Sequence, residues 1–378
     1  MAPYDTAIVG LGVIGSAAAW QLARRGQRVL GLDRHVPPHS HGSSHGRTRI
    51  IREAYFEHPL YVPLVQRAYE LWADLERAGG QTLMRRTGGL MLGVPASSVV
   101  AGALRSAREH ALAHEELTAA DVRRRFPGLV PTDDMAAVLE PRAGLLFPEA
   151  CVEALQQQAR AGGAVLEHDQ PMTSWYADGS GVTVTTPRRR YRAGRLLLSA
   201  GPWLPRLVEP LGLHLQVERQ LSHWFEPTGA REAFDAGRCP VTIWEHARGR
   251  IFYTVPDPGG QGLKAGIHHE GEMADPDSVR REPGPEDESR VRALLARHMP
   301  SANGRLLEAR VCLYTNTPDQ HFLIDRHPGY AQVILASPCS GHGFKFAPAI
   351  GEVLADVLMD GRSRFDLSPF ALGRLRPG

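Results

Sequence analysis

Hydrophobic and polar positions change their period several times along the chain, and the opening segment carries the clearest pattern. Residues 4–33 read as a short apolar run, a glycine-rich turn, an amphipathic stretch with helical spacing, a glycine break and a second apolar run. Short apolar runs bounded by turn residues are typical of buried strands, and the stretch between them is typical of a helix. The segment therefore predicts a βαβ unit.

The turn of this unit has the spacing of a dinucleotide site. Gly10, Gly12 and Gly15 form a G-x-G-x-x-G motif, where missing side chains let the backbone approach a pyrophosphate at the helix N-terminus. Asp33 follows Gly10 by 23 residues, at the end of the second predicted strand, where a carboxylate can accept from a ribose hydroxyl. The unit alone does not separate NAD from FAD.

The remaining chain alternates between helical and strand periods. Helical patterns occur at residues 60–78, 101–125 (a polar region), 150–160, 287–298 and 347–359. Strand patterns occur at residues 87–93, 164–169, 181–186, 195–201, 306–315 and 332–336, with a basic turn at 187–190. Residues 216–270 read as consecutive antiparallel strands, and the proline- and charge-rich residues 271–290 as a surface excursion. The late return to a glycine-rich helix start at 341–343 implies a cofactor domain that is discontinuous in sequence.

Composition narrows the class of protein. The chain has 378 residues, 43% of them hydrophobic and 22% charged, which predicts a globular protein of two domains or of one fold with a large insertion. The 43 basic and 41 acidic residues are dispersed, so nucleic acid is not an implied partner. We see no apolar run of about 18 residues and no charged leader, so neither membrane spanning nor secretion is indicated.

The cysteines and lysines are few. Cys151, Cys239, Cys312 and Cys339 lie far apart without CxxC spacing, which argues against a metal site and a disulfide framework and fits a reduced, cytoplasmic setting. Only two of the 43 basic residues are lysine, Lys264 and Lys345. Codon bias explains the excess of arginine, yet the surviving lysines suggest positions that need a compact ammonium group rather than a planar guanidinium.

Three segments together resemble one family. They are residues 45–52 (HGRTRIIR), 312–319 (CLYTNTPD) and 340–346 (SGHGFKF). These segments are similar to the signatures of the monomeric sarcosine oxidase family, which includes N-methyltryptophan oxidase, pipecolate oxidase and related amine oxidases with covalent FAD. The resemblance extends from Tyr4 to the final predicted helix, and the motifs occur in the family's order.

The resemblance implies an α/β (α+β) protein in which a glutathione-reductase-type FAD-binding Rossmann domain carries an antiparallel-sheet substrate domain over the flavin. We expect the FAD domain to comprise residues 1–84, 145–215 and 320–378, and the substrate domain residues 85–144 and 216–319. The family's FAD is attached through a cysteine thioether, and Cys312 matches that cysteine, with Cys339 as the competing thiol. Cys151 and Cys239 match no attachment position. The resemblance also implies a monomer.

The family's site residues can be carried over one by one. Arg52 and Lys345 match the pair that binds the substrate carboxylate, and Lys264 matches the lysine that activates oxygen beside the flavin. The other matches are His45, Thr48 and Arg49 on the flavin, Gly341 and Gly343 in the flavin-side motif, and Tyr253, His268 and Tyr314 in the substrate pocket. His268 has a better claim than His269 because residues 264 and 268 share one face of a strand.

The resemblance therefore implies an FAD-dependent oxidase of N-methyl or secondary amino acids, with a small-molecule amine and O₂ as substrates and no metal. Sarcosine, O₂ and water would give glycine, formaldehyde and hydrogen peroxide. The alternative of the same fold is an oxidase of N-methyltryptophan or of a pipecolate-type cyclic amine. The remoter alternatives are an NAD-dependent dehydrogenase and a non-catalytic flavoprotein partner.

Overall fold

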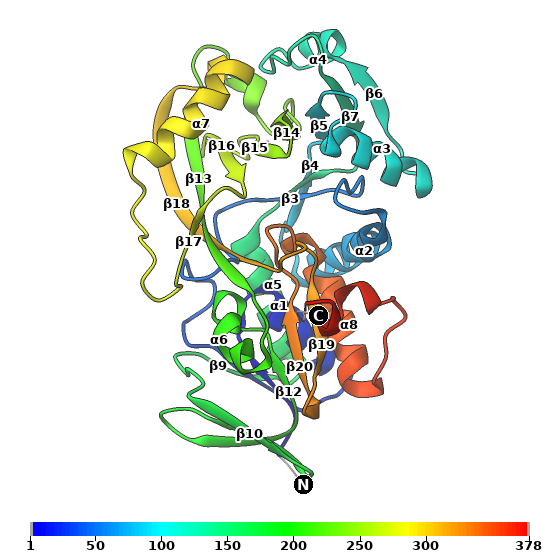
Figure 1. The fold of residues 1–378 in the computed structure, drawn as a ribbon, viewed down its shortest axis with the longest axis vertical. Coiled ribbons are helices and arrows are strands. Elements are labelled where there is room, and N and C mark those ends of the chain that lie inside the picture. Colours follow the sequence, from blue (N-terminus) through cyan, green and yellow to red (C-terminus); the bar gives the residue numbers. More distant parts are fainter. Residues whose placement is uncertain (1–2, 376–378) are drawn as a thin grey trace.

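The computed structural model describes residues 3–375, which form two large sheets with helices packed against them (Figure 1). The helices are α1 (Val13–Ala23), α2 (Val62–Gly79), α3 (Ser98–Glu109), α4 (Ala119–Arg125), α5 (Pro148–Ala161), α6 (Leu204–Val208), α7 (Pro285–His298) and α8 (Ala347–Asp360). One sheet lies in the lower half of Figure 1 and the other in the upper half, so the molecule has two lobes.

The lower sheet contains the predicted βαβ unit. Its strands are β1 (Tyr4–Val9), β2 (Val29–Leu32), β9 (Val165–Glu167), β10 (Ser174–Asp178), β11 (Gly181–Thr185), β12 (Arg190–Leu198), β19 (Leu323–His327) and β20 (Tyr330–Ser337). β1 lies between β2 and β12 and is parallel to both, which confirms the βαβ prediction. β9 extends the parallel part beyond β2, and β20 extends it beyond β12.

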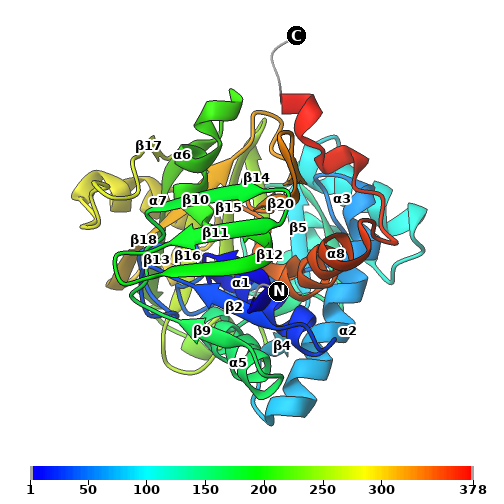
Figure 2. The ribbon, with the colours of Figure 1, turned by 90° about the horizontal axis from the view of Figure 1, so that it is seen from below.

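Helix α1 is enclosed on several sides, which explains its composition. It lies between α5 and α8 (Figure 2), and Ala17, Ala18 and Ala19 are all fully buried. Small side chains let the neighbouring helices approach closely. A Cβ on Gly351 of α8 would lie 2.6 Å from the backbone of Ala17, so this crossing requires glycine. The packing fixes the N-terminus of α1 relative to β1.

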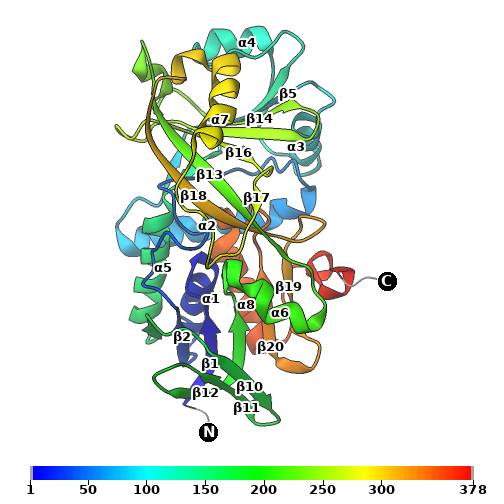
Figure 3. The ribbon, with the colours of Figure 1, turned by 60° about the vertical axis from the view of Figure 1, so that its left-hand side comes forward.

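The upper sheet is mostly antiparallel. Its strands are β5 (Gly89–Gly93), β6 (Glu115–Thr118), β7 (Ala136–Glu140), β13 (Gln216–Glu226), β14 (Val241–Ala247), β15 (Arg250–Val255), β16 (Leu263–His268), β17 (Glu272–Met273) and β18 (Arg305–Asn316). The predicted antiparallel strands within residues 216–270 are confirmed as β13, β14, β15 and β16. β13 and β18 are long paired strands that run from the upper lobe toward the lower one (Figure 3).

A third, small sheet lies between the lobes and bears on the site. It consists of β3 (Arg49–Ile51), β4 (Met84–Arg86) and β8 (Gly144–Leu146). A Cβ on Gly144 would lie 2.1 Å from the carbonyl oxygen of Arg85, so the close pairing of β4 and β8 needs glycine there. β3 begins at Arg49 and ends one residue before Arg52, so the sheet holds both arginines at the junction.

Some expectations about the elements were wrong. The predicted helical region at 101–125 contains most of α3, the strand β6 and α4, because Glu115 and Glu116 make β6 an exposed, polar edge strand with little hydrophobic signal. By contrast, the predicted surface excursion at 271–290 is confirmed as a mostly exposed segment, and it also contains β17, which pairs with β13, and the start of α7. Every strand of the lower and upper sheets lies within the segments expected for separate domains, while the domain boundaries themselves stay a prediction.

The excursion also reaches the lower lobe. Asp277 accepts hydrogen bonds from the Trp203 indole at 2.7 Å, from Arg34 at 2.9 Å and from Arg206. Arg281 donates to backbone carbonyls in the loop after β2. These contacts tie the two lobes together beyond the sheet junction. Within residues 3–375, no helix is both long and apolar enough to cross a membrane.

Candidate active site

A single elongated cavity of about 420 Å³ lies where the two lobes meet. One end lies at the turn between β1 and α1, beside Asp33, and Arg52 and Lys345 line the other end. Its walls come from the loop that follows β2, from β15, β16 and β18, and from residues 336–345. Segments far apart in the sequence therefore meet at this one cavity.

The glycine turn at the first end is a cradle that side chains would fill. Gly10 has φ +93°, and a Cβ on it would lie 2.5 Å from the carbonyl oxygen of Ser199. A Cβ on Gly15 would lie 1.8 Å from the carbonyl oxygen of Gly10. Gly12 offers no capping side chain to α1, and Ser44 Oγ accepts from the backbone N–H of Val13 at 3.0 Å. Close backbone approach and a helix N-terminus suit the phosphates of a dinucleotide.

Asp33 lies at the same end of the cavity. Its carboxylate accepts from the backbone N–H of Leu11 at 2.6 Å and from that of His35 at 2.9 Å. Although burial opposes it, His39 and these two backbone N–H groups hold the pKa of Asp33 below its ordinary value. Asp33 is therefore a charged acceptor on the wall, as a ribose site requires.

The turn at residues 46–48 is held from two directions. Glu149 accepts from the backbone N–H of Gly46 at 2.7 Å and of Arg47 at 3.1 Å. Lys264 donates to the carbonyl oxygens of Gly46 at 3.0 Å and Thr48 at 2.9 Å. Thr48 Oγ1 is buried and has no hydrogen-bond partner among the described residues. An orphaned hydroxyl on a residue of the cavity wall fits a polar group of a bound cofactor.

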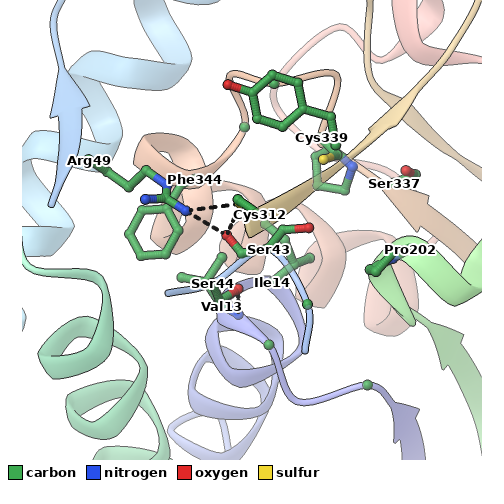
Figure 4. A pocket seen from close by; sticks show the side chains of 18 of the residues that line it. Val13, Ile14, Ser43, Ser44, Arg49, Pro202, Cys312, Ser337, Cys339 and Phe344 are labelled. Carbon is green, nitrogen blue, oxygen red and sulfur yellow. Dashed lines mark hydrogen bonds between the residues drawn. The ribbon is translucent and has the colours of Figure 1, made fainter. Parts of the chain in front are cut away.

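Figure 4 shows Arg49, Cys312 and Ser43 in contact on one wall of the cavity. Arg49 donates to the carbonyl oxygen of Ser43 at 3.0 Å, and the same nitrogen lies 3.4 Å from Cys312 Sγ. Cys339 also lines the cavity, but its sulfur accepts from the backbone N–H of Thr315 at 3.3 Å. Both candidate thiols therefore reach the cavity, and Cys312 is the one beside a guanidinium group.

Both lysines of the chain are buried in the cavity wall. Lys264 is 2% exposed and Lys345 is 5% exposed. Burial lowers the pKa of Lys264 well below its ordinary value, and Arg49 lowers it further. Burial also lowers the pKa of Lys345 to about 7, with a contribution from Arg52. Positive charge here is costly, so each position favours a ligand that supplies negative charge.

Arg52 has a partner that sequence reasoning missed. Its guanidinium contacts both carboxylate oxygens of Glu57, at 2.7 and 2.6 Å, and lies over the rings of Tyr55 and Phe56. Although burial opposes it, Arg52 lowers the pKa of Glu57 below its ordinary value. The signal in the sequence was an acid five residues after Arg52. A ligand carboxylate that binds Arg52 replaces or joins this internal one.

The aromatic and histidine residues fall into two groups. Tyr253, His268 and Tyr314 line the cavity, and Tyr314 Oη lies 3.3 Å from His268 Nδ1. His269 does not line the cavity, and its Nδ1 lies 3.2 Å from Glu218 Oε2. His45 does not reach the wall. It is buried behind the loop with Nε2 3.2 Å from the carbonyl oxygen of Gly42.

Most of the predicted site residues line the wall of the cavity. Gly15 also lies outside the cavity wall. It lies in the first turn of α1 and packs against the backbone of Gly10. Residues of the predicted site that line the wall are Gly10, Gly12, Asp33, Thr48, Arg49, Arg52, Tyr253, Lys264, His268, Cys312, Tyr314, Gly341, Gly343 and Lys345. Further functional candidates that the sequence did not single out are Ser43, Tyr55, Glu57, Glu149 and His342. The roles of all these residues stay predictions.

Comparisons with known proteins identify the family of this chain. The family model described as FAD dependent oxidoreductase matches residues 5–357. The monomeric sarcosine oxidase of Streptomyces avermitilis is 42% identical over 375 residues, which cover 98% of each chain. The N-methyl-L-tryptophan oxidase of Salmonella arizonae is 35% identical over 373 residues, covering 98% of this chain and 99% of that one.

A solved structure extends the likeness to the fold. The open form of NikD, an unusual amino acid oxidase essential for nikkomycin biosynthesis, superposes with a TM-score of 0.83. The two chains are 26% identical, and the match covers 97% of each.

Proposed function

This chain belongs to the family of FAD-dependent oxidoreductases, and on that premise we propose that it oxidises small secondary amino acids, with sarcosine as the first candidate substrate. The observation that carries the proposal is the pair of buried cations, Arg52 and Lys345, at the end of the cavity away from the dinucleotide cradle. Two buried cations side by side on the cavity wall select a carboxylate and leave the rest of a small molecule facing the cavity.

The cofactor is FAD, and the residues present fit it. The Gly10 turn and the N-terminus of α1 would hold the pyrophosphate, Asp33 the ribose, and Thr48 and Arg49 the polar edge of the ring system. Bound FAD supplies the acceptor for the electrons of the amine and then passes them to O₂. The protein contributes the fixed geometry and charge around it.

Covalent attachment of FAD through Cys312 is part of this proposal. Reactive cysteines occur in electropositive surroundings, and Arg49 lies 3.4 Å from Cys312 Sγ. Cys339 has the weaker claim, since burial raises its pKa and its sulfur already accepts a backbone hydrogen bond. The relative position of the two thiols on one cavity makes the choice testable.

The substrate end would work by binding and orientation. Arg52 and Lys345 bind the carboxylate, which must take Arg52 from Glu57 or share it. Tyr253, His268 and Tyr314 enclose the amine and keep bulk water away from it. Lys264 lines the same cavity beside the turn at residues 46–48, where its ammonium group can stabilise negative charge that develops on oxygen. The overall reaction with sarcosine is conversion with O₂ and water to glycine, formaldehyde and hydrogen peroxide.

The proposal also covers the domain bounds, the cellular location and the oligomeric state. We assign the FAD domain to residues 1–84, 145–215 and 320–378, and the substrate domain to residues 85–144 and 216–319, on the membership of the two sheets. Residues 1–2 and 376–378 of this assignment lie outside the described residues. All four cysteines are free, which suits a reduced, cytoplasmic setting. Relatives named monomeric sarcosine oxidase support a monomer that acts on a small amine and O₂.

The test is a panel of amines with detection of hydrogen peroxide. We expect sarcosine to give the highest kcat/KM, and N-methyltryptophan and pipecolate to give less. Peroxide formed only from a bulky or cyclic amine would reject sarcosine but keep the reaction class. Absence of peroxide with every amino acid, together with reduction of NAD, would reject the oxidase itself.

The carboxylate anchor gives a second expected result. Arg52→Ala and Lys345→Ala each remove a charge-assisted contact of about 1.5–3 kcal/mol, so the affinity for a carboxylate should fall roughly 10- to 100-fold. Methoxyacetate is a suitable probe, because it has the shape of sarcosine but lacks the amine. Its Kd can be measured from the change in flavin absorption, and an unchanged Kd in both variants would contradict the anchor.

A further inference from the structure

A network of buried hydrogen bonds leads away from Lys345 into the protein. Lys345 Nζ donates to Tyr55 Oη at 3.3 Å, and Tyr55 Oη lies 2.7 Å from His342 Nδ1. His342 Nε2 lies 3.0 Å from the carbonyl oxygen of Gln320. Tyr55 is fully buried and His342 is 7% exposed. Neither residue was part of the predicted site.

The donor and acceptor of every hydrogen bond in this network follow by elimination. The carbonyl of Gln320 can only accept, so the proton of the neutral imidazole lies on His342 Nε2. His342 Nδ1 is then an acceptor, and Tyr55 must donate its hydroxyl proton to it. The lone pairs of Tyr55 Oη are thereby left facing Lys345. Burial lowers the pKa of His342 to about 4, which keeps the imidazole neutral at ordinary pH.

The surroundings keep this arrangement rigid. The ring of Tyr55 packs against Tyr61 and Phe346, and that of His342 stacks on Phe322. Both cations of the substrate end lie over the Tyr55 ring, Arg52 at 4.2 Å and Lys345 at 5.1 Å from its centre. One tyrosine therefore contacts both halves of the carboxylate site, through its ring and its hydroxyl.

We propose that Tyr55 and His342 are positioning residues for the substrate carboxylate: His342 fixes the direction of the Tyr55 hydroxyl so that its oxygen holds Lys345 in place as an ammonium ion. The inference rests on the proposed function, because it needs Lys345 to bind the substrate. The Tyr55 hydroxyl contributes to the electrostatics of the site as well as to its geometry. A buried ammonium has few acceptors, and the one other acceptor of Lys345 among the described residues is the carbonyl oxygen of His342, 2.7 Å away.

Among the groups that face Lys345, the lysine is the one that changes charge near neutral pH. Glu140 lies behind the segment after β3, where it accepts from the backbone N–H of Ala54 at 2.7 Å, and burial raises its pKa to about 7, so its titration stays in Lys345→Met and is separated by that variant. Arg52 and Glu57 face it from the segment after β3, His268 from β16 and His342 from its own loop. Burial lowers the pKa of His268 well below its ordinary value, as it does for His342. Although burial opposes both shifts, the ion pair lowers the pKa of Glu57 and raises that of Arg52. None of these four titrates near the pKa of Lys345, about 7.

The test measures how the affinity for methoxyacetate depends on pH. A carboxylate binds the charged lysine, so affinity is present below the pKa of Lys345 and is lost as the pH rises through it. In Tyr55→Phe the ring stays and the acceptor is removed, which lowers the pKa of Lys345. We expect the pH of half-loss to fall by about one unit, so that affinity drops about tenfold near pH 8 and much less near pH 6. Titrations of the holoenzyme by flavin absorption give this profile without turnover.

Matched variants separate the possible outcomes. Tyr61→Phe removes a neighbouring buried hydroxyl that pairs with His321 and is not part of this network. The pH profile of its affinity for methoxyacetate should match that of the wild type. His342→Leu removes the acceptor that directs Tyr55 and should move the profile in the same direction as Tyr55→Phe. A uniform loss of affinity at every pH, or an unchanged profile, in Tyr55→Phe would overturn the inference.

Lys345→Met distinguishes failure of the inference from failure of the proposed function. This variant should bind methoxyacetate weakly and lack the pH break near 7. If it keeps the wild-type break, Lys345 is not the anchor, and both the anchor and the inference are wrong. If it loses the break while Tyr55→Phe keeps the wild-type midpoint, only the positioning role is wrong.

Discussion

Replacing Lys264 by methionine should slow the reaction of the reduced enzyme with O₂ by a factor on the order of 10²–10³ and leave reduction by the substrate almost unchanged. Methionine keeps much of the bulk of the side chain and removes its charge. Loss of one electrostatic contact to a developing anion costs about 3–4 kcal/mol, which corresponds to that factor. Stopped-flow absorption of the flavin measures the two half-reactions separately, under anaerobic conditions for reduction.

The structure adds a control to this experiment. Lys264 also supports the carbonyl oxygens of Gly46 and Thr48, so its loss could displace the turn that leads to Arg49. Glu149→Gln weakens the same turn from the opposite side while it keeps the ammonium group. If reoxidation slows equally in both variants, the effect belongs to the turn rather than to the charge. Slower reduction with normal reoxidation in Lys264→Met would move Lys264 to substrate binding.

Lys264→Arg tests why lysine persists at this position in a chain that otherwise uses arginine. A guanidinium keeps the charge but is larger and planar, and the space beside the turn is closed by the Trp224 ring, 5.2 Å from Nζ. We expect reoxidation to remain slow. Near-complete recovery would show that the position needs only positive charge.

Cys312→Ser should yield protein whose flavin separates completely from the chain on denaturation, whereas the flavin of the wild type should remain attached. Serine keeps the shape of the side chain but cannot form the thioether. The measurement is the absorption of the pellet and of the supernatant after precipitation with acid. Arg49 and the cradle around Gly10 should still bind FAD in the native variant, so its yellow colour before precipitation separates lost attachment from lost binding.

Cys339→Ser is the matched control, because this thiol lies on the same cavity without the neighbouring guanidinium. Its flavin should stay with the precipitated chain. Release of flavin from Cys339→Ser and retention in Cys312→Ser would reverse the assignment. Release from the wild type would show that the cofactor is held without a covalent bond.

The sequence predicted best what depends on neighbouring residues. The βαβ unit is encoded by apolar runs, a glycine motif and a helix within one stretch of about 30 residues, and β1, α1 and β2 follow it closely. The alternation of residues 264 and 268 likewise placed Lys264 and His268 on one wall, because a strand fixes which side chains share a face. The edge strand β6 was missed because it buries only Leu117.

Contacts between distant segments could not be predicted in this way. Tyr55 meets Lys345 across 290 positions, and Glu149 meets Gly46 across 103. Arg52 and Glu57 are close in sequence, but their pairing depends on a turn that no periodic pattern describes. The family resemblance supplied the residues that touch ligands, whereas the residues that support them from behind became visible only in the structure.

The burial of both lysines gives the molecule an unusual surface chemistry. Trypsin-like cleavage of the folded chain would depend on arginine alone, and acylating reagents would find no accessible ε-amino group on the described surface, since Lys264 and Lys345 are 2% and 5% exposed. Both amines line the cavity where the two lobes meet. Acylation of the two lysines, measured separately by mass spectrometry, should therefore report whether this cavity becomes accessible to a reagent.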